Sequence, residues 1–464
     1  MKDPLDVETL AAEVANGNFA DARLNGRLER IIERIGAEPS RSFPQVFSSA
    51  ELEGAYRFFS NVRVTPEEIL APHVGAVQRR CDAARRVLLV HDSSDFSFRV
   101  DGQRKDLGRA RCSSQTFYGH FTLALSADGL RKPLGVVALT TWTRGPELYA
   151  DKSGDDKERN RWLEQASKVS ANLTPETYAI SVMDREADNY ALFAKLTKTG
   201  QHFIVRGYLD RWLELPVDGS KEKLSNVVAS ITTQIDRDAS LTKRRPKRSP
   251  TKAKTHPERA ARVATLSVGA TAVLMLQTGY VPKGSARETI PINVVRVWEQ
   301  DPPEGEPPVE WILYTNEPIS TASEVLAVVD HYRARWTIEE YFKALKTGCS
   351  FERRQLQDYE STHEPPRDVC ASRIPGATAS NASSHRARCP SEYRAGRRRA
   401  RSPSRARTTQ TDALSNCTRS HARRRRTRRS HQVRPRPRLA DLIPRLSRAR
   451  CFNERMACCK IPLR

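Results

Sequence analysis

Two short apolar runs, each followed by an aspartate, most constrain how this chain can fold. Val87–Val90 leads into His91 and Asp92, and Tyr178–Met183 leads directly into Asp184. Short continuous apolar runs of this kind are typical of strands buried on both faces of a sheet. The pattern therefore predicts two buried strands, each with a carboxylate at its C-terminal end.

The segments around these two strands alternate between strand and helix patterns. Residues 119–125 and 134–142 are predicted antiparallel partners of the first strand, and residues 202–205 form one more strand. A helix is predicted from about Ala187 to Thr199. Repeated strands with intervening helices predict an α/β core.

The regions that flank this core have other patterns. Residues 7–70 show apolar residues at helical spacing, and they carry five arginines: Arg23, Arg27, Arg30, Arg34 and Arg57. These arginines are compatible with a solvated helical face or with a small DNA-binding module. Residues 207–310 are predicted to form a β-rich insertion, because 263–277 and 290–298 alternate as strands do. Within it, residues 243–262 are basic and aperiodic, which predicts a loop or hairpin tip.

A third acid lies on a predicted helix that begins at Ser320 or Thr321 and runs to about Lys346. At 100° per residue, four polar side chains fall within about 60° of one another: Tyr332, Arg335, Glu339 and Lys346. A stripe of charge is by itself compatible with a solvated face. Here the acid is flanked by cations that can bind phosphates, which favours a functional face.

The three acids have the chemistry of a divalent metal site. Hard cations such as Mg²⁺ prefer carboxylate oxygens, and Asp92, Asp184 and Glu339 can supply them. Two such ions, roughly 3.5–4 Å apart, can activate a nucleophile and stabilise the leaving oxygen of a phosphodiester. Each acid alone is equally compatible with a helix cap or a turn.

The net charge of +23 says little about what the folded part binds. From residue 365 to the end there are 26 Arg and one Lys against five acidic residues. We also expect no structural zinc site and no membrane segment, because metal-spaced cysteine pairs and apolar runs near 18 residues are missing from the sequence.

The spacing Y-x2-R-x3-E-x6-K, met by Tyr332, Arg335, Glu339 and Lys346, resembles the signature of DDE transposases of insertion-sequence family four. Asp184–Asp188 reads D-R-E-A-D, similar to the second-acid block of that family, and Asp92 lies in a stretch similar to its first-acid block. Residues 18–24 and 53–58 resemble its N-terminal end-binding domain. The resemblance spans about residues 7–358.

The resemblance implies an α/β fold with a ribonuclease H-like core. The implied segments are a helical transposon-end-binding domain (1–75), the first part of the core (76–206), the β-rich insertion (207–310), the rest of the core (311–358) and a disordered Arg-rich tail (359–464).

The implied activity is cut-and-paste DNA transposition: end cleavage, hairpin formation and strand transfer. Asp92, Asp184 and Glu339 would be the catalytic ligands of two Mg²⁺ ions, with Mn²⁺ as a substitute. DNA contacts would come from five residues: Tyr332, Arg335, Lys346, Arg206 and Trp311. Trp311 would stack on a flipped base, although ordinary sheet packing explains it equally well.

The implied partners are the terminal inverted repeats and target DNA, with a homodimer in the synaptic complex if the C-terminal region is intact. A bacterial cytoplasmic, nucleoid-associated protein is expected. The family's C-terminal helical domain has no counterpart after Tyr359. A catalytically inactive remnant that only binds DNA is therefore the alternative function.

We interpret the sequence from about residue 361 as an out-of-frame translation of GC-rich DNA. A selected basic tail usually mixes Lys with Arg, whereas this one is almost free of Lys. The competing interpretation is a disordered Arg-rich arm that binds DNA nonspecifically.

Resequencing the coding DNA across codons 350–370 tests this interpretation. We expect one of the other two frames to encode Leu- and Ala-rich helical sequence after the break. If neither frame does, the Arg-rich arm is genuine.

Overall fold

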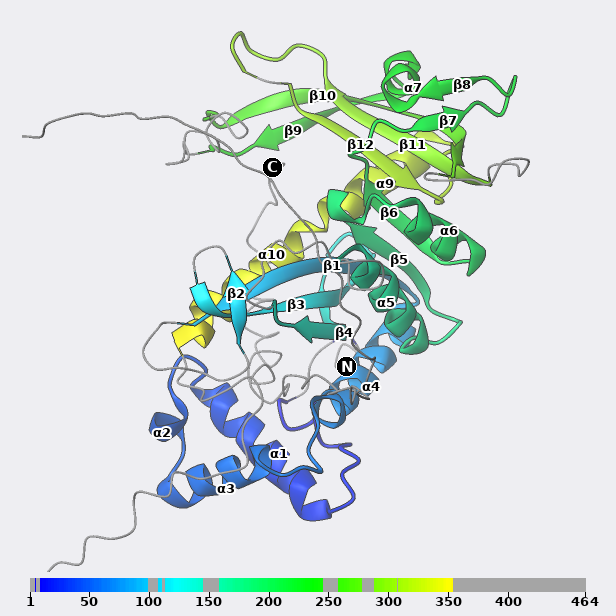
Figure 1. Cartoon of the computed structure of the whole chain (residues 1–464). Coiled ribbons are helices and arrows are strands. Elements are labelled where there is room, and N and C mark those ends of the chain that lie inside the picture. Colours follow the sequence, from blue (N-terminus) through cyan, green and yellow to red (C-terminus); the bar gives the residue numbers. More distant parts are fainter. Residues whose placement is uncertain are drawn as a thin grey trace, which may run out of the picture. The chain divides into compact units, whose positions relative to one another are not determined.

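The computed structural model describes residue 5 and residues 9–98, 107–110, 113–144, 158–244, 258–277, 288–306 and 308–353 (Figure 1). The Arg-rich tail and most of the basic segment 243–262 therefore lie outside the described residues. No helix in the described part of the chain is both long and apolar enough to cross a membrane.

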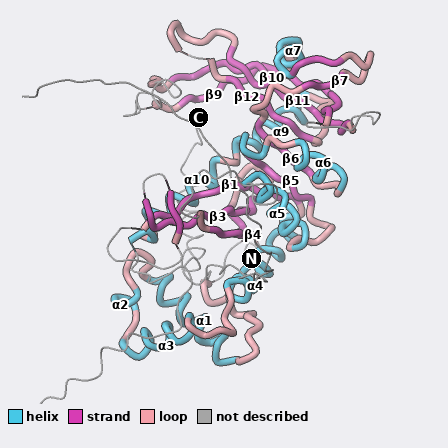
Figure 2. Tube along the Cα trace, viewed as in Figure 1, coloured by secondary structure: helices cyan, strands magenta, loops and turns pink. Residues whose placement is uncertain are grey.

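The described helices and strands follow one another as mixed α/β structure (Figure 2). The helices are α1 (Ala22–Ala37), α2 (Phe43–Val46), α3 (Ser49–Phe59), α4 (Pro66–Ala84), α5 (Glu158–Ala171), α6 (Tyr190–Lys198), α7 (Leu224–Ser230), α9 (Ala322–Arg333) and α10 (Trp336–Lys343). The strands are β1 (Arg86–Ser97), β2 (Gly108–Ala110), β3 (Ser113–Ser126), β4 (Pro133–Trp142), β5 (Tyr178–Met183), β6 (His202–Arg206), β7 (Trp212–Glu214), β8 (Lys221–Lys223), β9 (Ile235–Leu241), β10 (Arg262–Leu276), β11 (Thr289–Glu299) and β12 (Glu310–Thr315). Short helical turns are η2 (Arg185–Ala187), η3 (Ala344–Gly348) and η4 (Phe351–Arg353).

One mixed sheet contains all of these strands, in the order β2-β3-β1-β5-β6-β12-β11-β10-β7-β8, with β4 beside β3 and β9 beside β10. The pairs β1–β5 and β5–β6 are parallel, and β6 pairs antiparallel with β12. The predicted β-rich insertion thus extends the core sheet through β12, and it also contains the unpredicted helix α7. The predicted segment boundaries at 75/76 and 310/311 fall inside α4 and β12.

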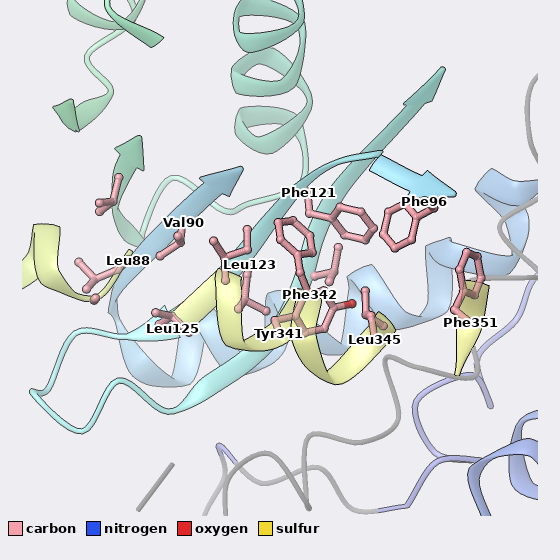
Figure 3. Close-up of a cluster of buried hydrophobic side chains, with 14 of the residues drawn as sticks. Leu88, Val90, Phe96, Phe121, Leu123, Leu125, Tyr341, Phe342, Leu345 and Phe351 are labelled. Carbon is pink, nitrogen blue, oxygen red and sulfur yellow. The ribbon is translucent and has the colours of Figure 1, made fainter. Parts of the chain in front are cut away.

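The alternation of side chains along β1 places helices on both faces of the sheet. Leu88 and Val90 belong to a core with α9 and α10, while Val87 and Leu89 pack with Val77 of α4 on the other face. Figure 3 shows the first of these cores, in which the aromatic and leucine side chains of α10 and η3 meet those of β1 and β3.

Three expectations about β1 and its surroundings were wrong in detail. β1 does not end before Asp92 but continues to Ser97, because β3 pairs with it along its whole length. β4 pairs with β3 and not with β1. The helix expected from Ala187 begins only at Tyr190, because Asp184 first caps the 3-10 turn η2.

The helix expected to run unbroken to Lys346 is also divided. Thr321 caps α9, with Glu324 completing a capping box. At the junction the backbone N–H groups of Ala334, Arg335 and Thr337 bond to carbonyls three residues earlier, at 3.0–3.1 Å. This tightening separates α9 from α10, and the π-helical turn η3 then ends at Gly348. In the N-terminal part, residues 10–16 form turns rather than the expected helix.

A buried ion cluster connects the N-terminal turns to α4 and β4. The Glu13 carboxylate accepts hydrogen bonds from Arg80 Nη1 and Nη2 at 2.6 and 3.0 Å, and lies 2.7 Å from His73 Nδ1. Val136 N–H donates to His73 Nε2 at 3.2 Å, so the ring proton is on Nδ1 and is donated to Glu13. Arg80 Nε donates to the Leu134 carbonyl at 2.8 Å. Every member of the cluster is thereby hydrogen-bonded, as buried charges require.

This cluster makes stability depend on pH. Burial alone would raise the pKa of Glu13, but the hydrogen bonds from His73 and Arg80, together with the positive charge of Arg80, outweigh it and lower the pKa to about 2. A carboxylate with a depressed pKa stabilises the fold above its unfolded pKa near 4.5, and this contribution disappears as the pH falls toward 2.

We predict that Glu13→Gln lowers the free energy of unfolding by roughly 3 kcal/mol at neutral pH, the equivalent of the pKa shift. Urea denaturation should show that the difference in the free energy of unfolding between wild type and variant becomes smaller as the pH falls from 4.5 toward 2. Glu53→Gln is the matched control, because Glu53 forms an exposed ion pair with Arg57. A difference in the free energy of unfolding that stays constant over this pH range would contradict the prediction.

Candidate active site

The two aspartates that follow the apolar runs lie at matching positions on neighbouring parallel strands. Val90 of β1 pairs with Val182 of β5, and Asp92 and Asp184 each come two residues later. Side chains two residues apart in a strand point to the same face. Both carboxylates are therefore directed to the face on which Val90 and Val182 pack with α9 and α10.

Local hydrogen bonds fix the backbone around each aspartate. Asp92 Oδ1 accepts from the Ser93 N–H at 2.8 Å, and Asp184 Oδ1 accepts from the Glu186 N–H at 2.7 Å as the cap of η2. Each carboxylate keeps its other oxygen for a second partner.

Arg335 joins the third acid to the first. Its Nη1 donates to Asp92 Oδ2 at 3.1 Å, and its Nη2 donates to Glu339 Oε1 at 2.6 Å. Arg335 is the residue that precedes α10, and Glu339 lies one turn later in the helix. One planar guanidinium therefore neutralises carboxylates from β1 and α10, which are 247 positions apart in the sequence.

The charges in this site influence one another. Burial raises the pKa of Asp92 to about 7; Arg335 opposes this rise, and the nearby charges of Asp184 and Glu339 add to it. Burial would lower the pKa of Arg335, but Tyr332, Asp92 and Glu339 together raise it above its ordinary value. Asp184 and Glu339 thus both lie within electrostatic range of Asp92, and one guanidinium binds two of the three acids.

The oxygen donors of this site suit a hard divalent cation. Nevertheless, in the described ranges no three His, Cys, Asp or Glu side chains converge closely enough to hold a metal ion. Arg335 provides the positive charge between two of the acids in this conformation. The residue types therefore fit a divalent metal, while in this conformation two of the acids are bound to Arg335.

Tyr332, Arg206 and Trp311 form a layer next to the acids. The Tyr332 side chain is buried and hydrogen-bonds to Arg206, and burial raises its pKa. The Trp311 ring lies edge-on to the Tyr332 ring, with 5.5 Å between centroids, and Trp311 is only 6% exposed. In this position the Trp311 side chain packs in the sheet. A base could stack on the ring only after the ring was uncovered.

Lys346 lies away from the three acids in this conformation. Its Nζ is 3.3 Å from Asp95 and 3.9 Å from Glu352, and it lies 5.3 Å from the centroid of the Phe96 ring. The structure thus gathers Asp92, Asp184, Glu339, Arg335, Tyr332, Arg206 and Trp311, while Lys346 is at the far end of the same helical face.

The sequence reasoning missed Asp188, the last residue of D-R-E-A-D. This aspartate is buried in an ion pair with Arg211 and binds two backbone N–H groups of the β6–β7 loop. An aspartate two residues before a helix, followed by the cap Asn189, was the available signal. Its partner could not be read from the sequence, because Arg211 lies in an aperiodic loop.

Comparison with known proteins gives the class of this protein. Residues 8–64 match the family model described as transposase DNA-binding, and residues 147–364 match the transposase DDE domain. The second match includes Asp184 and the segment from Tyr332 to Lys346, but it begins after Asp92. The chain therefore carries a transposase DNA-binding domain and a transposase DDE domain, and its class is that of the transposases.

Among solved structures, the chain resembles the cryo-EM structure of a piggyBac transposase synaptic complex with hairpin DNA. The identity is 9%, the TM-score is 0.32, and the alignment covers 76% of this chain and 68% of the other.

We predict that Arg335→Gln lowers the free energy of unfolding by roughly 2 kcal/mol, because two partly buried carboxylates lose their shared counter-charge. Chemical denaturation near neutral pH without added divalent ions measures this loss. Lys343→Gln is the control on the same helix, since its contact with Glu340 is long, at 3.8 Å, and exposed. Equal effects of the two substitutions would show that Arg335 has no special role in the apo site.

Proposed function

We propose that this protein is a DDE transposase of insertion-sequence family four that catalyses metal-dependent cut-and-paste transposition. The observation that carries the proposal is that Asp184 and Glu339 both act electrostatically on Asp92, while Arg335 binds Asp92 and Glu339. The motif spacing from Tyr332 to Lys346 and the two transposase domains support it. The substrate is the phosphodiester backbone at a transposon end.

Asp92, Asp184 and Glu339 would hold two Mg²⁺ ions, for which Mn²⁺ can substitute. When bound, such ions lower the pKa of an attacking water or 3′-hydroxyl and neutralise the leaving oxygen. The backbone hydrogen bonds at Asp92 and Asp184 orient these two carboxylates before any ligand enters. Such preorganisation reduces the reorganisation that the reaction requires.

Arg335 has two alternative partners in this proposal. In the free protein it neutralises Asp92 and Glu339. A DNA phosphate offers the same planar pair of oxygens that a guanidinium binds best. As DNA enters, Arg335 transfers its hydrogen bonds to the phosphate and leaves the carboxylates free.

The remaining residues position the strand. Arg206 is oriented by its hydrogen bond to Tyr332, which Trp311 supports from within the core. Lys346 would reach a phosphate farther along the strand, near the hairpin. Residues 8–64 would bind the terminal repeat, and a homodimer on two ends would form the synaptic complex on the bacterial chromosome.

Incubating the protein with DNA that carries the element's terminal repeats and Mg²⁺ tests the proposal. We expect strand cleavage followed by a hairpin product. Asp92→Asn should reduce cleavage about 1,000-fold, because several kcal/mol of charge stabilisation disappear.

The same assay separates the alternative function. Repeat-specific binding without any cleavage, unchanged by Asp92→Asn, would identify a DNA-binding remnant. Glu176→Gln serves as the control for non-specific effects, because Glu176 is exposed and lies outside both the DNA-binding match at residues 8–64 and the acid cluster.

A further inference from the structure

Two aromatic side chains are exposed on the loop that joins β6 to β7. Tyr208 is 67% exposed and Trp212, where β7 begins, is 51% exposed. Large aromatic side chains are normally buried, and exposed ones at a rigid position often mark a binding surface. The loop follows Arg206 directly, so it starts at the candidate active site.

The loop is held rigidly by the buried Asp188. Asp188 Oδ2 accepts the backbone N–H groups of Tyr208 at 2.7 Å and Leu209 at 2.8 Å, and its other oxygen pairs with the buried Arg211. Gly207 packs against the Tyr314 ring so closely that a Cβ there would lie 3.0 Å from it. The two exposed rings are therefore presented from a fixed backbone, which reduces the entropy lost on binding.

Each exposed ring has a cation beside it. The Arg185 guanidinium lies 5.5 Å from the centroid of the Tyr208 ring, and Lys223 Nζ lies 5.0 Å from that of Trp212. Lys223 is itself positioned by a hydrogen bond to the Asp210 carbonyl at 3.1 Å. Arg185 is the residue that follows Asp184, so this surface and the acid cluster share the same short segment.

We propose that Tyr208 and Trp212, with Arg185 and Lys223, form a stacking surface for unpaired bases of the DNA strand whose backbone lies at Asp184. Aromatic rings stack on bases of any sequence, and neighbouring cations bind the phosphates between them. This inference rests on the proposed function and adds the requirement for a single-stranded or opened segment.

Unpaired bases are the specific target because bases within a duplex already stack on their neighbours. Only a frayed end, an overhang or a flipped nucleotide offers a free face to an exposed ring. Trp311 is buried in the structure, whereas Tyr208 and Trp212 are accessible without any rearrangement. Tyr208 and Trp212 can therefore meet a base in the conformation described, whereas Trp311 can do so only once it is uncovered.

The test compares two DNA ligands: a blunt duplex and the same duplex with a short single-stranded overhang that contains 2-aminopurine. Binding is measured by fluorescence anisotropy without divalent ions, so that no strand is cut. Wild-type protein should bind the overhang ligand more tightly and quench the 2-aminopurine fluorescence. Tyr208→Leu and Trp212→Leu should each weaken overhang binding about tenfold and reduce the quenching.

Three comparisons make the result specific. Tyr208→Phe keeps the ring and should bind as wild type does. Val217→Ala shortens an even more exposed apolar side chain in the next turn and should have no effect. All variants should unfold at the wild-type temperature, because the substituted side chains are exposed.

An equal loss of affinity for both DNA ligands, or no loss for either, would overturn the stacking proposal. No loss of affinity for either DNA ligand would indicate that the exposed rings bind a protein partner instead. Because the assay measures binding alone, it can fail while the cleavage assay succeeds, and the reverse also holds.

Discussion

The need to neutralise carboxylates in a partly buried site is the constraint on which the rest of this structure depends. Asp92 lies in β1, Asp184 follows β5 and Glu339 lies in α10; burial raises the pKa of Asp92, and the charges of the other two acids add to that rise. Charges of the same sign in a site of low polarity repel strongly unless a counter-ion lies among them. Arg335 provides that counter-ion by binding Asp92 and Glu339 with one planar group.

This solution has a functional consequence, because a guanidinium is also an excellent ligand for phosphate. The residue that makes the apo site stable is the one proposed to hold the DNA backbone. Binding of substrate and release of the acids are then two aspects of one exchange of hydrogen bonds. Tyr332, on the same helical face, stays buried and supports Arg206 rather than joining the exchange.

The continuous sheet explains how a strand-rich insertion can contribute to this site. Since β12 pairs with β6, the loop after β6 lies between the parallel core strands and the inserted strands. Asp188, in the segment that carries Asp184, binds that loop through the Tyr208 N–H and the Arg211 side chain. The loop therefore brings Tyr208 beside Arg185, the residue that follows Asp184, and leads on to Trp212 at the start of β7.

Much of the local structure could be predicted from the sequence. The apolar run at Tyr178–Met183 coincides with β5, and Thr321 caps α9 as expected. Both are determined by contacts between near neighbours in the chain, which periodicity and capping rules describe. The spacing from Tyr332 to Lys346 likewise identified the helix that carries Glu339.

The remaining features depend on partners distant in sequence, and only the tertiary structure decided them. β1 extends past Asp92 because β3 continues to pair with it, and no local signal marks that end. Arg335 binds Asp92 across the fold, Trp311 is buried by Tyr332, and Asp188 selects Arg211 from an aperiodic loop. The sequence alone determined which residues are candidates for the chemistry, because charge and local periodicity are properties of the chain. Packing decided which of those charges are paired and which rings remain exposed, because both depend on what the fold brings beside them.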